Sequence, residues 1–384
     1  MNLIIYEDYL TEQIKPFSIN HAIFEIKTGL YSNIERFVNS FPDYKIYLVV
    51  RAEIEDVVRY RFPQFTVNPK TLPSAKCINS KVVWREDYIN VFSKESLLYF
   101  FNESSIAIDD FNRKVKSLKY LKDDSVIKID FIWDTIYLFN ELIINDFKKI
   151  EKKSLKKYDD VKFIKSNLIH IGDNVTLKPG VIIDASNGPV FIKDNVTIDI
   201  GSLVQGPVLI DDNSYISLGA KIRSGTLIGP NCKIGGEIIN TIFHGKSNKV
   251  HDGFIGHSFI GEWVNIGAGT NNSNLKNNYS NVKFDFGKKI IDSKKIFLGT
   301  MIGDFSRISI STSINTGTYI GVGSNIFNHS FNKKFVTSFS WGNSDKVDFD
   351  KFIKTCNLAL QRRDCQLHES EIKLLNYLYK KKMI

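Results

Sequence analysis

The sequence predicts an α/β domain, followed by a left-handed parallel β-helix and a short helical tail. Short apolar runs alternate with amphipathic segments in the first 147 residues, an aliphatic residue recurs at every sixth position from about Ile171, and two amphipathic segments end the chain. A chain of 384 residues is long enough for two or three domains. We place the α/β domain at 1–147, a basic linker at 148–164, the β-helix at 165–335 and the helical tail at 336–384.

The first domain contains strand-like runs at 2–6, 45–50, 96–100 and 105–108. At its end, Ile132, Ile136, Phe139, Ile143 and Phe147 follow helical spacing, which predicts an amphipathic helix that closes the domain. The next ten residues, 148–157, hold six lysines and one glutamate and so carry +5 of the net charge of +9. Such a run is typical of a solvated linker, so we do not expect a nucleic-acid partner.

The β-helix rests on the period of six. Each flat face of a triangular coil takes six residues, so a β-branched side chain at every sixth position points inward and stacks on its equivalent in the next coil. Glycine and asparagine cluster between these positions, where the backbone turns a corner. The inward positions form two runs: Ile192, Ile198, Val204, Ile210, Ile216, Ile222, Ile228 and Ile234, then Ile296, Ile302, Ile308, Ile314, Ile320 and Ile326.

Composition excludes several classes of protein. Cys77, Cys232, Cys356 and Cys365 are scattered without a CxxC pair, which favours reduced or buried thiols over a disulfide framework. The N-terminus lacks the pattern of an export signal, and nowhere do 18 apolar residues run together. We therefore expect a cytoplasmic protein with no membrane span.

Between Glu237 and Lys295 the period lapses, and it is expected to recover at Phe254, Ile260 and Ile266 after a two-residue shift. The segment Asn248–Gly269 introduces a lysine, two histidines, an aspartate and a tryptophan there. We interpret the break as the place where a polar group, His251, projects from the coil into a cleft in place of an inward isoleucine. A lone histidine can equally be an ordinary solvent-facing residue.

The residues around this break carry a resemblance. The order H-x-x-F-I-G, V-N-I-G-A-G-T and N-x-x-x-N is similar to the acetyltransferase half of the bifunctional N-acetylglucosamine-1-phosphate uridylyltransferase/glucosamine-1-phosphate acetyltransferases. The phrases GGEIINTIF, INTGTYIGV and SFSWG, together with WDTIYLFNELIINDF and LALQRRDCQLHESE, resemble a divergent branch of that family with a compact N-terminal half. The resemblance implies an acetyl-CoA-dependent N-acetyltransferase acting on an amino-sugar 1-phosphate.

The resemblance also implies roles for residues on the sugar side. His251 matches the general base, and imidazole suits proton removal from an ammonium near neutral pH. Arg223 matches the group that grips the sugar phosphate, and Asn265 and Asn274 match the amides that orient the sugar and its amine. Phe254 stands where the better-known branch has a tyrosine, which removes one hydroxyl contact.

For the cosubstrate, Ala268 and Thr300 match positions that meet the acetyl-CoA arm. Backbone donors there could stabilise the oxyanion of acyl transfer. Lys333 and Lys334 follow the last coil and could meet the CoA phosphates, although ordinary surface lysines would look the same.

The N-terminal half departs from its motif. Residues 16–37 resemble the opening motif of the divergent branch, with His21 and Lys27 in place of two arginines. Lys27 keeps its charge without bidentate binding, and a histidine is largely neutral at pH 7. Uridylyl transfer with UTP and Mg²⁺ therefore competes with a degenerate domain or an altered substrate, and the metal stays unassigned.

Two other functions compete with acetyl transfer. A β-helix zinc hydratase is one alternative, because the segment contains three histidines, His244, His251 and His257. However, the six-residue spacing between His251 and His257 is wider than the spacing of the paired zinc ligands in that family. A sugar-1-phosphate nucleotidyltransferase could instead use the β-helix only as a trimerisation scaffold. In each case we expect a homotrimer, and we expect substitution of His257 to be nearly silent.

Overall fold

The computed structural model describes residues 1–86, 88, 98–117, 126–151, 156–327, 333–342 and 345–381. The expected strand at 96–100 and the linker residues 152–155 therefore lie partly or wholly outside the described residues. The chain forms two compact units. The first comprises Met1–Lys27, Tyr31–Phe131 and Leu367–Leu378, and the second comprises Thr28–Leu30, Ile132–Gln366 and Tyr379–Ile384.

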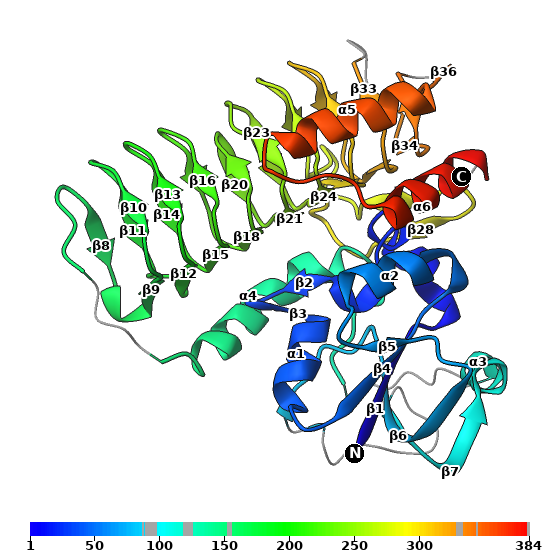
Figure 1. Cartoon of the computed structure of the whole chain (residues 1–384). Coiled ribbons are helices and arrows are strands. Elements are labelled where there is room, and N and C mark those ends of the chain that lie inside the picture. Colours follow the sequence, from blue (N-terminus) through cyan, green and yellow to red (C-terminus); the bar gives the residue numbers. More distant parts are fainter. Residues whose placement is uncertain are drawn as a thin grey trace. The chain divides into compact units, whose positions relative to one another are not determined.

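The first unit is built on one five-stranded sheet in the order β5-β4-β1-β6-β7 (Figure 1). The central strand β1 pairs in parallel with β4 and β6, while β7 is antiparallel to β6. Most residues of β1 and β4 are apolar and buried, as expected for strands of a sheet that is covered on both faces. The sheet strands are β1 (Asn2–Tyr6), β4 (Lys45–Val49), β5 (Thr66–Val67), β6 (Thr71–Asn79) and β7 (Leu98–Ala107), and the other elements are β3 (Tyr31–Ser32), α1 (Asn33–Ser40), α2 (Glu55–Arg61) and α3 (Ile108–Ser117).

The predicted tail, 336–384, contains two helices, α5 (Phe349–Gln361) and α6 (Glu369–Lys380). The predicted end of the β-helix at 335 is too early, because strands of the ten-stranded sheet continue to Lys346. Residues Leu367–Leu378, most of α6, belong to the first unit. There the His368 ring stacks on Tyr60 at a centroid distance of 3.7 Å, and Glu371 pairs with Arg61 at 3.2 Å.

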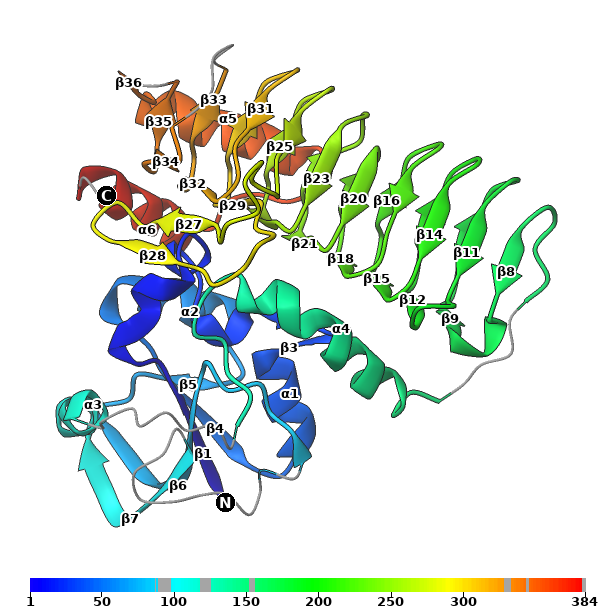
Figure 2. The same cartoon turned by 180° about the vertical axis from the view of Figure 1, so that it is seen from behind.

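The second unit contains the β-helix, in which successive strands add in parallel to three sheets (Figure 2). The last strand, β36, is the exception and is antiparallel to β35. The ten-stranded sheet holds β10 (Thr176–Leu177), β13 (Thr197–Ile198), β16 (Tyr215–Ile216), β19 (Lys233–Ile234), β22 (Asn248–Lys249), β25 (Asn265–Ile266), β30 (Arg307–Ile308), β33 (Asn325–Ile326), β35 (Ser340–Trp341) and β36 (Asp345–Lys346). The six-stranded sheet holds β8 (Lys162–Ile164), β11 (Ile182–Asp184), β14 (Leu203–Gln205), β17 (Lys221–Ile222), β20 (Glu237–Ile239) and β23 (Phe254–Gly256). The nine-stranded sheet holds β9 (Ile169–Ile171), β12 (Val190–Ile192), β15 (Val208–Ile210), β18 (Thr226–Ile228), β21 (Ile242–Gly245), β24 (Phe259–Glu262), β29 (Thr300–Ile302), β32 (Thr318–Ile320) and β34 (Phe335–Val336).

The period of six predicts the coil interior correctly with one exception. Every residue of the first run is at most 1% exposed. The residues of the second run from Ile302 to Ile326 are at most 2% exposed. Ile296 is instead 46% exposed, because it lies in the segment that returns to the coil before β29 rather than on a face.

The coil is not interrupted between Glu237 and Gly269, contrary to the expectation from the sequence. The interior continues through Ile238, Phe243, Ile255 and Ile260, because three faces of the coil are four or five residues long instead of six. Phe254, expected to point inward, is only half-buried, and its neighbour Ile255 occupies the interior at 0% exposure.

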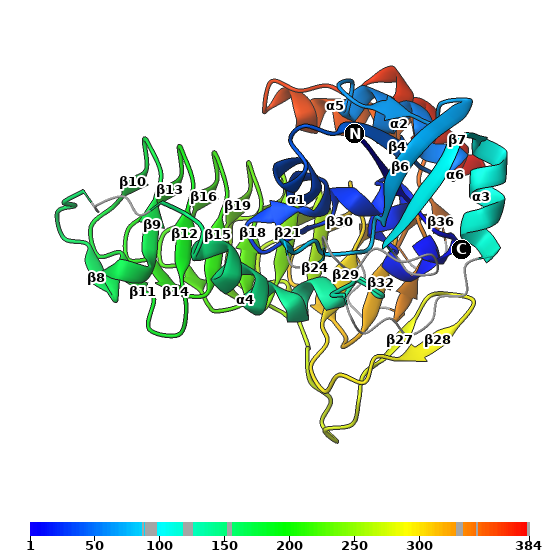
Figure 3. The same ribbon diagram turned by 90° about the horizontal axis from the view of Figure 1, so that it is seen from below.

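An excursion leaves the coil after β26 (Asn271–Asn272) and returns at β29. It carries an antiparallel hairpin of β27 (Lys283–Asp285) and β28 (Ile290–Asp292), which stands away from the coil in Figure 3. Within the second unit, Phe284 of this hairpin packs edge-on against Trp133 at 5.3 Å.

Helix α4 (Asp134–Phe147) forms where helical spacing predicts it, with the expected apolar face buried. It groups with the second unit rather than closing the first. Its Phe147 ring meets Phe191 of β12 edge-on at 6.3 Å, and its Asp146 carboxylate accepts from the Leu30 amide at 2.9 Å. The strand β8 begins at Lys162, so the coil starts inside the segment predicted as linker.

Among the described residues, no helix combines the length and the apolar character needed to cross a bilayer. All four cysteines are free thiols. Cys77, Cys232 and Cys356 are buried and Cys365 is exposed, which agrees with the expectation of reduced thiols.

Candidate functional site

A pocket of about 790 Å³ opens on the ten-stranded sheet of the β-helix. Its floor consists of outward side chains of β16, β19, β22 and β25, and the end of α5 forms its wall. The described lining residues are Tyr215, Lys233, Lys246, Asn248, Val250, His251, Trp263, Val264, Asn265, Ala359, Arg362 and Arg363.

His251 reaches this pocket from the corner that follows β22. The ring is exposed, and the carbonyl oxygen of His251 accepts a 2.6 Å hydrogen bond from Lys249 Nζ. Neighbouring coils fasten the same corner, because the Gly253 and Asp252 carbonyls accept from the Glu237 and Gly269 amides at 3.1 and 2.9 Å. A short polar corner thus presents the imidazole to the pocket.

The pocket is strongly basic. Of its described lining residues, Lys233, Lys246, Arg362 and Arg363 are cations and none is a carboxylate. The Trp263 ring lies 5.8 Å from Lys246 Nζ and 5.6 Å from the Arg363 guanidinium carbon, both within the range of cation–π contact. Nη1 of Arg363 donates to the carbonyl of Asn231, which ties the end of α5 to the coil.

The two arginines that follow α5, Arg362 and Arg363, were not predicted as site residues. The spacing of α5 indicates only an amphipathic helix, and nothing local shows that Arg362 and Arg363 lie beside His251. Their position depends on how α5 packs along the coil (Figure 1).

The predicted sugar-side residues separate into two groups. Asn265 lies in the pocket, where its Oδ1 accepts from Asn248 Nδ2 at 2.9 Å. Arg223 and Phe254 belong to the six-stranded sheet instead. There Arg223 Nη1 pairs with Glu237 Oε1 at 2.8 Å, and Glu237 lies in register with Phe254 on the next strand.

Asn274 lies with His257 rather than with His251. Its Nδ2 is 2.9 Å from His257 Nδ1, and the His257 ring stacks on Phe297 at 5.1 Å. Burial lowers the pKa of His257 to about 4, so the imidazole stays neutral near pH 7. His257 is therefore half-buried and packed against Phe297.

The predicted cosubstrate residues also lie outside the pocket. Thr300 is fully buried, and its hydroxyl donates to the Thr318 carbonyl at 3.0 Å. The Ala268 carbonyl accepts from the Ser311 amide at 2.7 Å, one coil further on. Lys333 is exposed, whereas burial and then the charge of Lys276 lower the pKa of Lys334.

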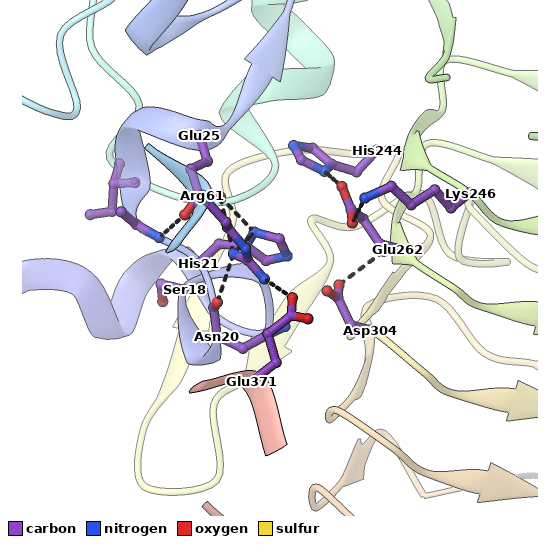
Figure 4. Close-up of polar contacts among 12 residues, drawn as sticks. Ser18, Asn20, His21, Glu25, Arg61, His244, Lys246, Glu262, Asp304 and Glu371 are labelled. Atoms are coloured by element: carbon purple, nitrogen blue, oxygen red, sulfur yellow. Dashed lines mark hydrogen bonds and ion pairs between the residues drawn. The ribbon is translucent and has the colours of Figure 1, made fainter. Parts of the chain in front are cut away.

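The three histidines proposed for a zinc site lie on different elements. His244 ends its nine-stranded-sheet strand near Glu262, with Nδ1 3.2 Å from Oε1 (Figure 4). The other oxygen of Glu262 pairs with Lys246 at 2.8 Å. His251 lies at the corner after β22 and His257 at the corner after β23. Within the described part of one chain, these histidines do not form a three-ligand group.

The first unit has its own pocket, of about 550 Å³, at the carboxyl ends of β1 and β4. Ligands of open α/β sheets bind at such strand ends. The described lining includes five carboxylates (Glu7, Asp8, Glu53, Glu55 and Asp109) and two cations (Arg51 and Lys116).

A buried lysine also lies at these strand ends and was not anticipated from the sequence. Lys81 follows β6, is 2% exposed and has its Nζ 3.5 Å from Asp8 Oδ1. Burial lowers its pKa, while Asp8 and Asp130 act in the opposite direction.

His21 and Lys27 do not line this pocket among the residues described for it. His21 is 2% exposed and stacks on Phe17, with its Nδ1 3.2 Å from Glu25 and 2.9 Å from Arg61 (Figure 4). Burial would raise the pKa of Glu25, but Arg61 and His21 outweigh it and lower that pKa to about 2. Lys27 is half-buried on β2 (Lys27–Thr28).

Comparison with known proteins gives one family match and two relatives that are similar over part of their length. Residues 3–154 match the family model described as sugar nucleotidyl transferase. The chain is 31% identical over 197 residues to the bifunctional protein GlmU of Wigglesworthia glossinidia brevipalpis, covering 49% of this chain and 39% of that protein. It is 34% identical over 163 residues to a bifunctional sugar-1-phosphate nucleotidylyltransferase/acetyltransferase of Sulfurisphaera tokodaii, covering 42% of this chain and 38% of that protein. The match thus spans about two fifths of either relative.

Among solved structures, the UDP-N-acetylglucosamine acyltransferase of Campylobacter jejuni covers 57% of this chain and 94% of its own, at 12% identity and a TM-score of 0.27. A TM-score of 0.27 is too low to support a conclusion about fold or function. The sheet of the first unit and the parallel coil of the second define a hexapeptide-repeat β-helix joined to a sugar nucleotidyltransferase-like domain. In sequence, the chain is similar to bifunctional sugar-1-phosphate nucleotidylyltransferases/acetyltransferases over part of their length, and its residues 3–154 are similar to sugar nucleotidyl transferases.

Proposed function

We propose that this protein transfers the acetyl group of acetyl-CoA to the amine of an amino-sugar 1-phosphate, with glucosamine 1-phosphate as the first substrate to test. The observation that carries this proposal is an exposed histidine, His251, in a pocket whose described lining holds four cations and no carboxylate. Both proposed substrates are anionic. Charge-assisted hydrogen bonds from lysine and arginine are the strong contacts for phosphate oxygens.

In the proposed reaction, the His251 imidazole accepts the proton that the sugar ammonium must lose. The free amine then attacks the thioester carbonyl, a C–N bond forms, the C–S bond breaks, and CoA leaves as a thiolate that takes up a proton. A positioned base of this kind contributes about 10² to 10⁴ to the rate. Asn265, beside His251 in the pocket, is proposed to orient the sugar.

Exposed aliphatic residues on the same ridge of the coil as His251 support a homotrimer. Ile200, Leu218 and Ile310 each stand two residues beyond an inward isoleucine, as His251 stands two beyond Lys249, so they share one ridge of the coil. They are 59%, 70% and 68% exposed. Contiguous exposed apolar side chains mark association surfaces.

We propose that further copies of the chain cover this ridge and complete the site. Arg223 and Phe254 lie on the six-stranded sheet, across the ridge from the pocket, so association along the ridge offers a route by which both groups could serve one substrate. Contacts of Ala268, Thr300, Lys333 and Lys334 with the CoA arm stay proposals of the same kind. For Thr300 only the backbone is available, since its side chain is buried.

The direct test is acetyl transfer from acetyl-CoA to glucosamine 1-phosphate by the purified chain and by His251→Ala. We expect a rate loss of about 10² to 10⁴ with an unchanged melting temperature, because exposed substitutions usually alter stability by less than about 0.5 kcal/mol. Asn248→Ala, in the same pocket, is the matched control for a polar truncation without the base. An unmodified chain that neither binds acetyl-CoA in calorimetry nor acetylates any amino-sugar phosphate would favour the scaffold alternative.

Uridylyl transfer by the first unit is the second candidate function. The match over residues 3–154 and the pocket at the strand ends support it. Carboxylates such as Glu7 and Asp8 are the ligands that Mg²⁺ prefers, so the acidic lining suits a metal that would neutralise phosphate charge. Pyrophosphate release from UTP and N-acetylglucosamine 1-phosphate, with and without Mg²⁺, measures this activity. Robust release would show that His21 and Lys27 suffice in place of arginines.

A further inference from the structure

A lysine occupies a position of the β-helix interior that isoleucine holds in the preceding coil. Lys249 lies in register with Ile234 on the neighbouring strand of the ten-stranded sheet. It is 0% exposed, like Ile234 and the next interior residue, Ile255. The departure from the repeat at this point is therefore inside the coil, two residues before the exposed His251.

The amine of Lys249 has a defined hydrogen-bond partner at the end of the buried side chain. Its Nζ donates to the His251 carbonyl at 2.6 Å. Two glycines make room for it, because a Cβ on Gly236 or on Gly253 would come within 3.0 or 3.3 Å of Nζ. Both glycines have positive φ, +74° and +130°, which side chains rarely adopt. The lysine thus crosses the interior and ends in a small polar cradle under the His251 corner.

An isoleucine would fill the same position without the cost of burying an amine. Burial lowers the pKa of Lys249 to about 8, although Asp252 acts in the opposite direction. A charged group in an apolar interior is destabilising unless its hydrogen bonds repay desolvation. The bond to the His251 carbonyl is the contact through which this residue can affect the site.

We propose that Lys249 is a positioning residue for the base, and that its amine anchors the corner Val250–Gly253 so that the His251 ring faces the pocket. This inference rests on the proposed acetyl transfer, in which His251 acts as the base. The alternative is that Lys249 only fills space in the coil. The two roles predict opposite outcomes when isoleucine restores the repeat.

The test compares Lys249→Ile with the unmodified protein by hydrogen exchange and by acetyl-transfer kinetics. The Glu237 and Gly269 amides, which donate to the Gly253 and Asp252 carbonyls, report on the corner directly. We expect their exchange to quicken roughly tenfold or more, the loss associated with a hydrogen bond to a charged group. The urea midpoint should not fall, because isoleucine packs as its neighbours do.

In the same variant, kcat should fall about tenfold or more while KM for acetyl-CoA changes less than twofold. Lys249→Met, which keeps a long side chain without the amine, should show the same fall in kcat and the same small change in KM. Ile234→Met, at the paired position one coil away, is the control for altered packing and should leave the exchange of both amides and kcat nearly unchanged.

Two results would overturn the proposal. Unchanged exchange at Glu237 and Gly269 in both lysine variants would show that Lys249 does not anchor the corner, whether or not the chain is an acetyltransferase. Faster exchange with an unchanged kcat would show that the anchoring does not serve the base. Lack of acetyl transfer by the unmodified protein would instead contradict the proposed function, and the exchange measurement would still distinguish the two failures.

Discussion

Replacing Lys249 by isoleucine should make the β-helix more stable, and the gain should depend on pH. In the unfolded chain a lysine ammonium persists to about pH 10.5, whereas burial in the coil lowers the pKa of Lys249 to about 8. Between these values folding releases a proton, so the stability of the unmodified protein rises with pH. Below pH 8 both states hold the proton, and the full cost of burying the charge applies.

The magnitude follows from these two pKa values. A tenfold change in proton affinity corresponds to about 1.4 kcal/mol, so the fall from 10.5 to about 8 makes the buried ammonium cost about 3 kcal/mol. Lys249→Ile removes that cost and adds an aliphatic side chain beside Ile234. We expect the free energy of unfolding of the variant to exceed that of the unmodified protein by about 3 kcal/mol at pH 7. This figure does not include the hydrogen bond that the variant loses. Most of this difference should be gone by pH 10.

The assay is urea unfolding of both proteins at pH 7, 8, 9 and 10, followed by circular dichroism. The quantity compared is the difference between their free energies of unfolding at each pH. Ile234→Met is the control, because it alters packing at the paired position without a titratable group, so its difference should not vary with pH. A difference for Lys249→Ile that is constant from pH 7 to 10 would refute the burial argument.

Three further expectations concern other parts of the coil. Burial lowers the pKa of His257 to about 4, so below pH 6.5 the unfolded chain binds a proton that the folded protein does not. The free energy of unfolding should therefore fall by up to about 3 kcal/mol as pH drops from 6.5 toward 4. His257→Gln should remove this pH dependence in urea unfolding. Substituting alanine for both Arg362 and Arg363 should raise KM for an anionic substrate about tenfold or more with the fold kept, and an unchanged KM would remove them from the site. Leu218→Asp on the exposed ridge should shift the mass in light scattering from three chains toward one chain of 43.9 kDa, whereas an unmodified protein that is already monomeric would contradict the trimer.

Much of the fold could be read from local patterns, because each pattern repeats. A period of six places Ile198, Ile216 and Ile234 inside the coil irrespective of what surrounds it, since every coil packs on a copy of itself. Helical spacing likewise placed α4 and α5 correctly. The resemblance drew attention to His251, and the structure places that residue in a basic pocket, although its role as the base stays a proposal.

The pattern failed where the length of a face changed. When one face loses a residue, the inward positions that follow it shift along the sequence, so Ile255 and not Phe254 points into the coil. For the same reason the interior position near the break belongs to Lys249, whereas we had interpreted the break as the exit of His251 from the coil. A lysine in sequence is read as a surface residue, because only the packed coil shows its amine enclosed.

Contacts between segments far apart in the chain were beyond any local pattern. Arg363 lies 112 positions after His251, and the two meet in one pocket because α5 packs along the coil. Asn274 was expected beside His251 but contacts His257, since the excursion after β26 places it at a different corner. Periodicity depends on neighbours along the chain and is visible in the sequence, whereas the site depends on which corners and helices come together, and only tertiary packing determines that.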